Sequence, residues 1–284
     1  MATLRDIQVR IKSVKNTQQI TNAMKMVSAA KLRKAEEEIK AARPYAQKMS
    51  GVMSNLASRT KPDAHPLLIN RGGSKKELIV ITSDRGLCGG FNGSILKKAE
   101  RLIKENKEGE ITLTLIGKKG EIYFKRRGMS VRKKYKHPGK GDYDFAAGIG
   151  EEVATSFAEE IFDEVHIIYN EFKSVMLQNL VIEKLLPIVA VESEDEAPIV
   201  DYIVEPSQDA VLEELLPRHF KVQIFRALME SIASEHGARM TAMGAATNNA
   251  RDMITGLTLK YNRLRQASIT TELMDIVNGV ESMK

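Results

Sequence analysis

The sequence predicts an α/β protein in which a long antiparallel coiled coil from both termini carries an inserted Rossmann-like α/β domain. Three observations lead to this prediction. The last third of the chain is almost free of helix breakers, the first fifth repeats apolar residues at coiled-coil spacing, and the middle alternates short apolar runs with helical stretches. The expected organisation is a two-helix shaft from residues 1–58 and 208–284, an α/β domain over 75–190, and linkers at 59–74 and 191–207.

The C-terminal helix is expected to be unusually long. Pro217 is the only proline after Pro206, and it lies near the helix start, where a first turn or a mild kink tolerates it. At 1.5 Å per residue, a helix over residues 208–281 is roughly 110 Å long. A helix of that length exceeds what one globular core covers, so it carries force, spans distance or pairs with another helix.

The N-terminal helix, over residues 3–58, is the expected pairing partner. Its apolar residues step by three and four, as in a coiled coil, with a phase shift after Val14. The two predicted seam segments are Leu4, Ile7, Ile11 and Val14, then Ile20, Met24 and Val27. The matching C-terminal segments are Ile254, Leu257, Tyr261 and Leu264, then Ile269, Leu273, Ile276 and Val280.

The middle of the chain is predicted to form strands that alternate with helices. Strands are expected at 77–82, 111–117 and 164–170, and 179–187 is a candidate for an antiparallel edge strand that ends at Pro187. Helices are expected at 92–105, 120–127 and 149–161. This alternation is typical of a sheet with helices on its faces.

A glycine-rich turn, residues 83–93, follows the first strand and opens a helix. This is where a dinucleotide site places its glycines, but Gly86-x-x-Gly89-Gly90 does not match G-x-G-x-x-G. The Gly-Lys-Ser/Thr motif of a phosphate-binding loop is also missing. We therefore interpret these residues as a structural turn that needs glycines for its backbone geometry. The five histidines lack zinc-site spacing, and Cys88 is the only cysteine. We therefore expect no catalytic residue, no metal site and no cofactor.

Composition and charge narrow the class of protein. Apolar residues make up 43% and charged residues 28% of the chain, no run approaches a membrane span, and no secretory leader is evident. Residues 1–58 hold 11 Lys/Arg and 4 Asp/Glu, a net charge of +7 against +6 for the whole chain. A basic helix suits an acidic protein collar, an anionic lipid surface or a nucleic acid. Nucleic acid is disfavoured, because aromatic residues are sparse and no known reader motif is present.

Three separated segments carry a resemblance to a known family. Residues 265–279 read Arg-Gln-Ala-Ser-Ile-Thr-Thr-Glu-Leu-Met-Asp-Ile-Val-Asn-Gly, residues 11–31 begin Ile-Lys-Ser-Val-Lys-Asn-Thr, and residues 83–92 read Ser-Asp-Arg-Gly-Leu-Cys-Gly-Gly-Phe-Asn. Together with Arg43-Pro44-Tyr45, they resemble the gamma subunit of the F-type ATP synthase in its bacterial form. Val280 departs from the family pattern, which has Ala there.

The resemblance implies a non-catalytic rotor shaft that couples proton-driven rotation of a membrane ring to ATP synthesis or hydrolysis at beta subunits. The implied partners are the alpha and beta subunits of a catalytic hexamer, the epsilon subunit and the ring of c subunits, with the α/β domain as a foot on that ring. The implied location is the cytoplasmic face of the bacterial cell membrane, with membrane contact only through the complex. By position, the implied subunit contacts are Arg265, Gln266, Thr270, Glu272, Asp275, Met24 and Lys25.

Two alternative functions stay open at this point. A nucleotide-binding α/β protein with a helical arm would bind NADH or ATP as an isolated chain. A coiled-coil nucleic-acid-binding protein would retain DNA in a salt-dependent way.

Overall fold

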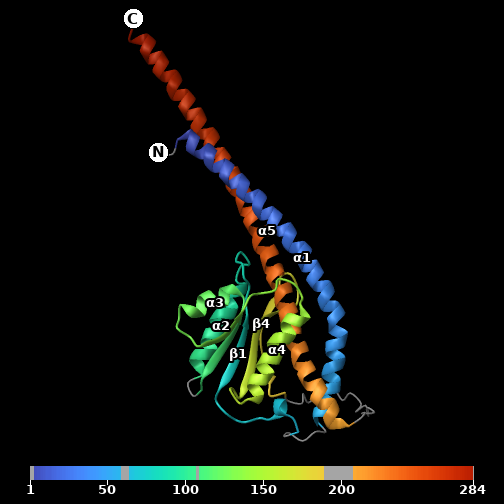
Figure 1. Cartoon of the computed structure of the whole chain (residues 1–284). Coiled ribbons are helices and arrows are strands. Elements are labelled where there is room, and N and C mark those ends of the chain that lie inside the picture. Colours follow the sequence, from blue (N-terminus) through green and yellow to red (C-terminus); the bar gives the residue numbers. More distant parts are fainter. Residues whose placement is uncertain (1–2, 59–63, 107–108, 189–206, 284) are drawn as a thin grey trace. The chain divides into compact units, whose positions relative to one another are not determined.

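The computed structural model describes residues 3–58, 64–106, 109–188 and 207–283. The chain divides into two compact units, one formed by Met1–Ser28 with Met240–Lys284 and the other by Ala29–Arg239. Helices α1 (Leu4–Ser58) and α5 (Gln208–Glu281) each contribute to both units (Figure 1). We call them the shaft unit and the sheet unit and describe each in turn.

The sheet unit is built on one mixed sheet. Its strands are β1 (Lys76–Ile81), β2 (Ile111–Ile116), β3 (Val131–Tyr135), β4 (Glu164–Phe172) and β5 (Gln178–Leu186). The spatial order is β3-β2-β1-β4-β5, with parallel pairing except between β4 and β5. This order confirms the predicted α/β class and the antiparallel direction of the last strand.

Helices cover both faces of this sheet. On one face, α2 (Phe91–Glu105) and α3 (Lys118–Lys125) pack over Leu78, Val80 and Leu113. On the other face lie α4 (Tyr143–Ala158) and the part of α5 in this unit, where Arg226 of α5 bonds Glu183 of β5. A short 3-10 turn, η1 (Pro66–Leu68), lies inside the predicted 59–74 linker and buries Leu67.

Two predictions for this unit were wrong in detail. The sequence analysis placed a helix at 149–161, whereas α4 begins at Tyr143 because the Asp142 carboxylate accepts the Phe145 N–H at 3.1 Å and caps the helix. It also missed β3, whose residues Val131–Tyr135 include three consecutive basic residues. Basic residues are common on edge strands because they discourage pairing with other chains.

Within the sheet unit one stretch of α5 is enclosed on every side. Residues 227–237 are all buried, and they include polar side chains such as Ser231, Ser234 and Glu235. Leu32, Ala35 and Ile39 of α1 are buried in the same unit. A helix enclosed by neighbours on all sides loses the polar face that a surface helix keeps.

In the shaft unit the two helices run antiparallel. The Thr21 and Thr247 hydroxyls lie 2.8 Å apart, and the Gly244 backbone lies beside the Lys25 side chain. The long terminal helices therefore pack together, as predicted.

The N-terminal half of the predicted seam was partly wrong. Buried or half-buried positions continue from Val14 through Gln18, Thr21, Met24 and Ser28 without a phase shift. Ile20 and Val27, expected in the seam, are 60% and 56% exposed. The polar residues tolerate burial because Thr21 and Ser28 donate to the carbonyls of Gln18 and Met24 at 3.0 and 2.8 Å.

Candidate functional site

The shaft unit contains every residue that the sequence analysis proposed for subunit contact. Its paired segment joins α1 up to Ser28 with α5 from Met240. On α5 the predicted seam residues Ile254, Leu257, Tyr261 and Leu264 are all half-buried. Each helix buries only one narrow stripe there, so most of its surface faces outward.

Beyond Ser268 of α5, no described position is buried or half-buried (Figure 1). We call residues 269–283 the overhang. The predicted seam residues Ile269, Leu273, Ile276 and Val280 continue at steps of four and three, yet they are 49–64% exposed. The spacing is that of a helix-pairing stripe. However, α1 begins only at Leu4 and does not extend far enough to cover these residues.

The five C-terminal contact candidates are all exposed at or near the overhang. The Thr270 hydroxyl donates to the Gln266 carbonyl at 2.9 Å, and the Ser268 hydroxyl donates to the Glu272 carboxylate at 3.2 Å. Within the described ranges, Arg265 and Asp275 have no side-chain hydrogen bond or ion pair. Their charged groups are free for an external partner.

The two N-terminal candidates form a separate group. Met24 is half-buried and Lys25 is exposed beside Gly244. Gly244 precedes Arg265 by about 20 residues of the same helix, which is roughly 30 Å. The structure therefore places the seven candidate residues in two separate groups and does not bring them all together.

Sequence reasoning missed a third feature of the shaft unit, an outer apolar stripe on α1. Val9, Ile20 and Val27 are each more than half exposed. Their separations of 11 and 7 residues place them on one face of a helix, opposite Ile7 and Ile11. The signal was present in the sequence, because Ile20 and Val27 do not continue the spacing of the Leu4–Val14 seam.

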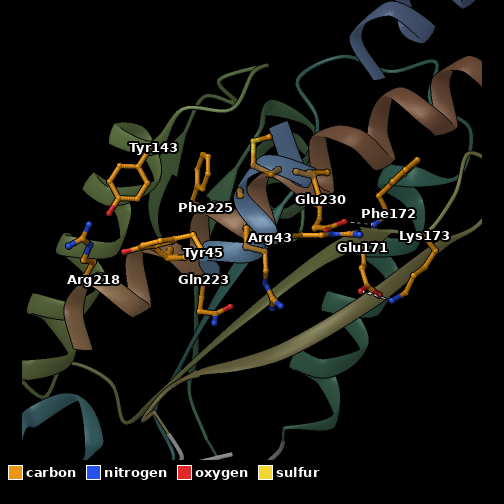
Figure 2. A pocket seen from close by; sticks show the side chains of 15 residues that line it. Arg43, Tyr45, Tyr143, Glu171, Phe172, Lys173, Arg218, Gln223, Phe225 and Glu230 are labelled. Carbon is orange, nitrogen blue, oxygen red and sulfur yellow. Dashed lines mark hydrogen bonds and ion pairs between the residues drawn. The ribbon is translucent and has the colours of Figure 1, made fainter. Parts of the chain in front are cut away.

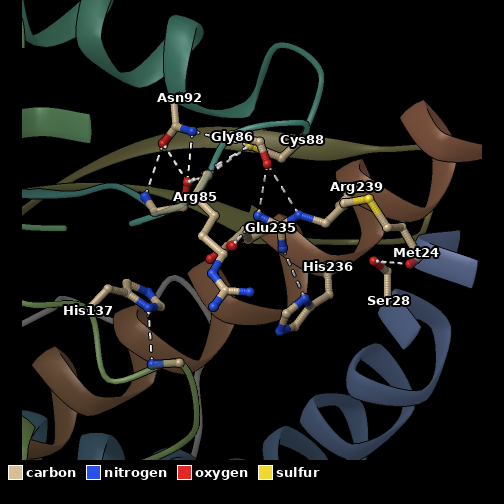
Figure 3. Close-up of polar contacts among 12 residues, drawn as sticks. Met24, Ser28, Arg85, Gly86, Cys88, Asn92, His137, Glu235, His236 and Arg239 are labelled. Carbon is tan, nitrogen blue, oxygen red and sulfur yellow. Dashed lines mark hydrogen bonds and ion pairs between the residues drawn. The ribbon is translucent and has the colours of Figure 1, made fainter. Parts of the chain in front are cut away.

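The glycine-rich turn of the sheet unit is held by its own side chains (Figure 3). The Asn92 amide accepts from the Ser83 N–H at 3.0 Å and donates to Cys88 Sγ at 3.1 Å. Gly89 has a φ of +56°, a conformation that favours glycine. Arg239 of α5 points its guanidinium at the Gly86 carbonyl, with two nitrogens at 3.4 Å. These contacts support a structural turn.

The remaining chemistry of the sheet unit is that of a packed interior. Cys88 is buried, and burial raises the pKa of its thiol. The Asp84 carboxylate accepts from the Lys118 N–H at 2.9 Å and from the His137 N–H at 3.3 Å, so it joins the turn to the start of α3 and to the segment after β3. No cluster of three or more His, Cys, Asp or Glu side chains in the described part of the chain is arranged to hold a metal ion.

Known proteins match the chain over its full length. The family model described as ATP synthase matches residues 3–283. The ATP synthase gamma chains of Geobacter metallireducens and Anaeromyxobacter sp. (strain Fw109-5) are 52% and 47% identical, each match covering all of both chains. The chain belongs to the ATP synthase gamma chain family. This confirms the resemblance drawn from the three sequence motifs.

Solved structures agree with this family. A chain from the central stalk and c-ring of the Tetrahymena thermophila mitochondrial ATP synthase is 27% identical, with a TM-score of 0.62, and the match covers 80% of this chain and 99% of that one. A chain of the Euglena gracilis enzyme gives a TM-score of 0.73 at 22% identity, over 99% of this chain and 94% of that one, and so supports the fold.

Membership in the gamma chain family sets the broad function. A gamma chain is the central stalk, or rotor, of the F-type ATP synthase, and the catalytic sites lie in the beta subunits. The chain is thus a non-catalytic subunit of a peripheral membrane complex. No helix in the described ranges has an apolar stretch long enough to cross a membrane.

Proposed function

We propose that this gamma chain works as the rotating shaft inside a hexamer of alpha and beta subunits, with the overhang as its inner end. The main support for the proposal is the apolar stripe Ile269–Leu273–Ile276–Val280, which no described part of the chain covers. Exposed apolar stripes of this length are typical of surfaces that contact other proteins. An unsupported helical end of about 15 residues is only marginally stable in water, so a surrounding collar would stabilise it.

The mechanism follows from asymmetry. A shaft with one helix beyond the end of the other presents different side chains in different directions. Each rotary angle would then contact the three beta subunits differently and shift their open and closed populations. Proton-driven rotation of the c-ring would in this way drive ATP synthesis, and ATP hydrolysis would drive the reverse rotation.

The individual contacts are proposed by position. Arg265 and Gln266 would bond a loop of one beta subunit through charge-assisted hydrogen bonds, with Thr270, Glu272 and Asp275 beside them. Met24 and Lys25 would face an acidic segment of beta lower on the shaft. The net charge of +7 on residues 1–58 supports an acidic partner there.

The sheet unit is the proposed foot of the shaft. It would bind the c-ring and the epsilon subunit, which places the chain at the cytoplasmic face of the bacterial cell membrane. The chain would touch the membrane only through the complex.

The test is the double variant Arg265→Ala/Gln266→Ala in the assembled complex. Losing a hydrogen bond to a charged group costs about 1.5–3 kcal/mol, so turnover should fall by roughly 10–100-fold if that energy is lost from a rate-limiting state. The measurements are steady-state ATP hydrolysis and synthesis. Circular dichroism of the free subunit should barely change, because Ala is a good helix former.

The matched control is Asn249→Ala/Arg251→Ala, which removes an amide and a guanidinium from exposed positions in the paired segment of the same helix. Its turnover should stay near that of the unchanged complex. Equal turnover in both double variants would show that Arg265 and Gln266 do not carry the coupling.

A further inference from the structure

The sheet unit contains a cavity of about 670 Å³ that the proposed function does not use (Figure 2). Its walls come from α1 near Ile39–Tyr45, from α5 between Arg218 and Glu230, from the start of α4 at Tyr143, and from the end of β4 at Phe172. Cavities of roughly 300–1,000 Å³ are typical of sites for small organic ligands.

The two ends of the cavity differ in chemistry (Figure 2). At one end Tyr143 and Phe225 pack edge to face with centroids 5.7 Å apart, and the Arg218 guanidinium lies 5.8 Å from the Tyr45 ring. At the other end, Glu171 pairs with Lys173 at 2.8 Å. Ile39, Val222 and Met229 add apolar surface to the lining. The aromatic end thus combines apolar surface with a cation.

The carboxylates of the lining are already engaged. One Glu230 oxygen accepts the Phe172 N–H at 3.0 Å, and the other lies 3.6 Å from Arg43. Glu171 is occupied by Lys173. The lining carries four cationic side chains, Arg43, Lys173, Arg218 and Arg226, against these two carboxylates.

Two of the cations have unused donors. Arg218 forms no ion pair with any residue in the described ranges. Arg226 donates one terminal nitrogen to Glu183 at 2.6 Å, while its Nε is buried without a hydrogen-bond partner. Buried donors without partners are uncommon and costly. The Arg218 guanidinium is the donor that a ligand acceptor at this cavity would engage, because the Arg226 Nε has almost no accessible surface.

We propose that this cavity binds a small amphipathic anion: an aromatic or acyl body that carries one sulfonate, carboxylate or phosphate group. The apolar body fits the surface of Phe225, Val222 and Met229, and the anionic group fits the surplus of guanidinium donors. Because the walls belong to α1, α4, α5 and β4, a bound molecule joins all four elements. Binding therefore stabilises the folded sheet unit by mass action.

The test uses two fluorescent probes with the same aromatic body, 8-anilinonaphthalene-1-sulfonate and the neutral N-phenyl-1-naphthylamine. Both are titrated into the full-length chain. The sulfonate should bind saturably to one site per chain, more tightly than the neutral probe, and should raise the melting temperature. Equal affinity for the two probes would overturn the assignment of an anion site.

Two pairs of variants locate the site. Arg218→Gln should weaken sulfonate binding about fivefold, which is about 1 kcal/mol, whereas Arg33→Gln, an exposed charge elsewhere on α1, should not. Ala42→Phe places a ring in the cavity and should abolish binding, while Ala41→Phe, at the neighbouring exposed position, should leave it intact. Circular dichroism checks that each variant is folded. Unchanged binding in folded Arg218→Gln and Ala42→Phe would place the probe elsewhere and refute the proposal.

Discussion

Two stretches of the same helix, α5, have opposite environments. Residues 227–237 are all buried and include two serines, two glutamates and a histidine, whereas residues 269–283 are all exposed and include Ile269, Leu273 and Ile276. Burial here does not follow side-chain polarity. The neighbouring elements determine burial, because the sheet, α4 and α1 enclose the first stretch, and none of the described elements covers the second.

The two stretches therefore obtain their stability from different sources. The enclosed stretch depends on partners inside the chain, including ion pairs and hydrogen bonds that burial makes costly to break. Under the proposed function, the overhang obtains its partners from other subunits. Substitutions should therefore reduce the stability of the free chain in the sheet unit far more than in the overhang.

The largest effect is expected from breaking a buried ion pair. Glu77 is fully buried, and Arg132 lies 3.2 Å from it and 2.8 Å from Glu152. Arg132→Met leaves Glu77 without its cation, which should lower the free energy of unfolding by about 3–5 kcal/mol. Urea denaturation of the full-length chain measures this. Lys133→Met, a half-exposed neighbour, is the control and should cost less than about 1 kcal/mol.

A somewhat smaller effect for each residue is expected from acid. Burial lowers the pKa of both His219 and His236 to about 4, whereas an unfolded histidine titrates near 6.5. Between pH 6.5 and 4 the unfolded chain binds protons that the folded chain does not, so stability present above pH 6.5 is lost as the pH falls. The loss should reach about 2–3 kcal/mol for each histidine.

Urea denaturation at several pH values measures this loss. The variant His236→Leu should reduce the dependence of the free energy of unfolding on pH. Burial raises the pKa of Glu77, so that carboxyl acts in the opposite direction. A free energy of unfolding that stays constant from pH 6.5 to 5 would contradict the prediction.

A moderate effect is expected in the paired segment of the shaft unit. The Thr247 hydroxyl contacts the Thr21 hydroxyl and the Met243 carbonyl at 2.8 and 2.7 Å. Thr247→Val should cost about 1 kcal/mol because it leaves Thr21 without this partner. The double variant Thr21→Val/Thr247→Val should recover most of that loss, since both partners become apolar. Purely additive costs in thermal unfolding would mean that the two hydroxyls do not interact.

The smallest effect is expected in the overhang. Ile276→Ser should change the free energy of unfolding of the free chain by less than about 0.5 kcal/mol, because Ile276 is 64% exposed. The same substitution at fully buried Ile224 should cost several kcal/mol. A loss above 1 kcal/mol for Ile276→Ser would indicate that the overhang packs against its own chain or a second copy.

The sequence by itself determined the architecture and the family. Three features are local properties of the chain and could be predicted without a structure: long helices with few breakers, strands with short apolar runs, and three motifs in order. The predicted C-terminal seam from Ile254 to Leu264 was correct for the same reason. The contact roles proposed for Arg265, Gln266, Thr270, Glu272, Asp275, Met24 and Lys25 stay predictions that depend on other subunits.

Only the tertiary structure decided which side chains are enclosed. Thr21 and Ser28 fill the seam in place of Ile20 and Val27, because each hydroxyl bonds a carbonyl of its own helix and the partner helix determines which face is covered. Residues Val131–Tyr135 form a strand because their backbone pairs with β2, and Glu77 and Glu152, distant in sequence, neutralise Arg132. The cavity near Arg218 joins segments more than 170 residues apart. Such arrangements arise from contacts between remote residues, which periodicity along the chain does not encode.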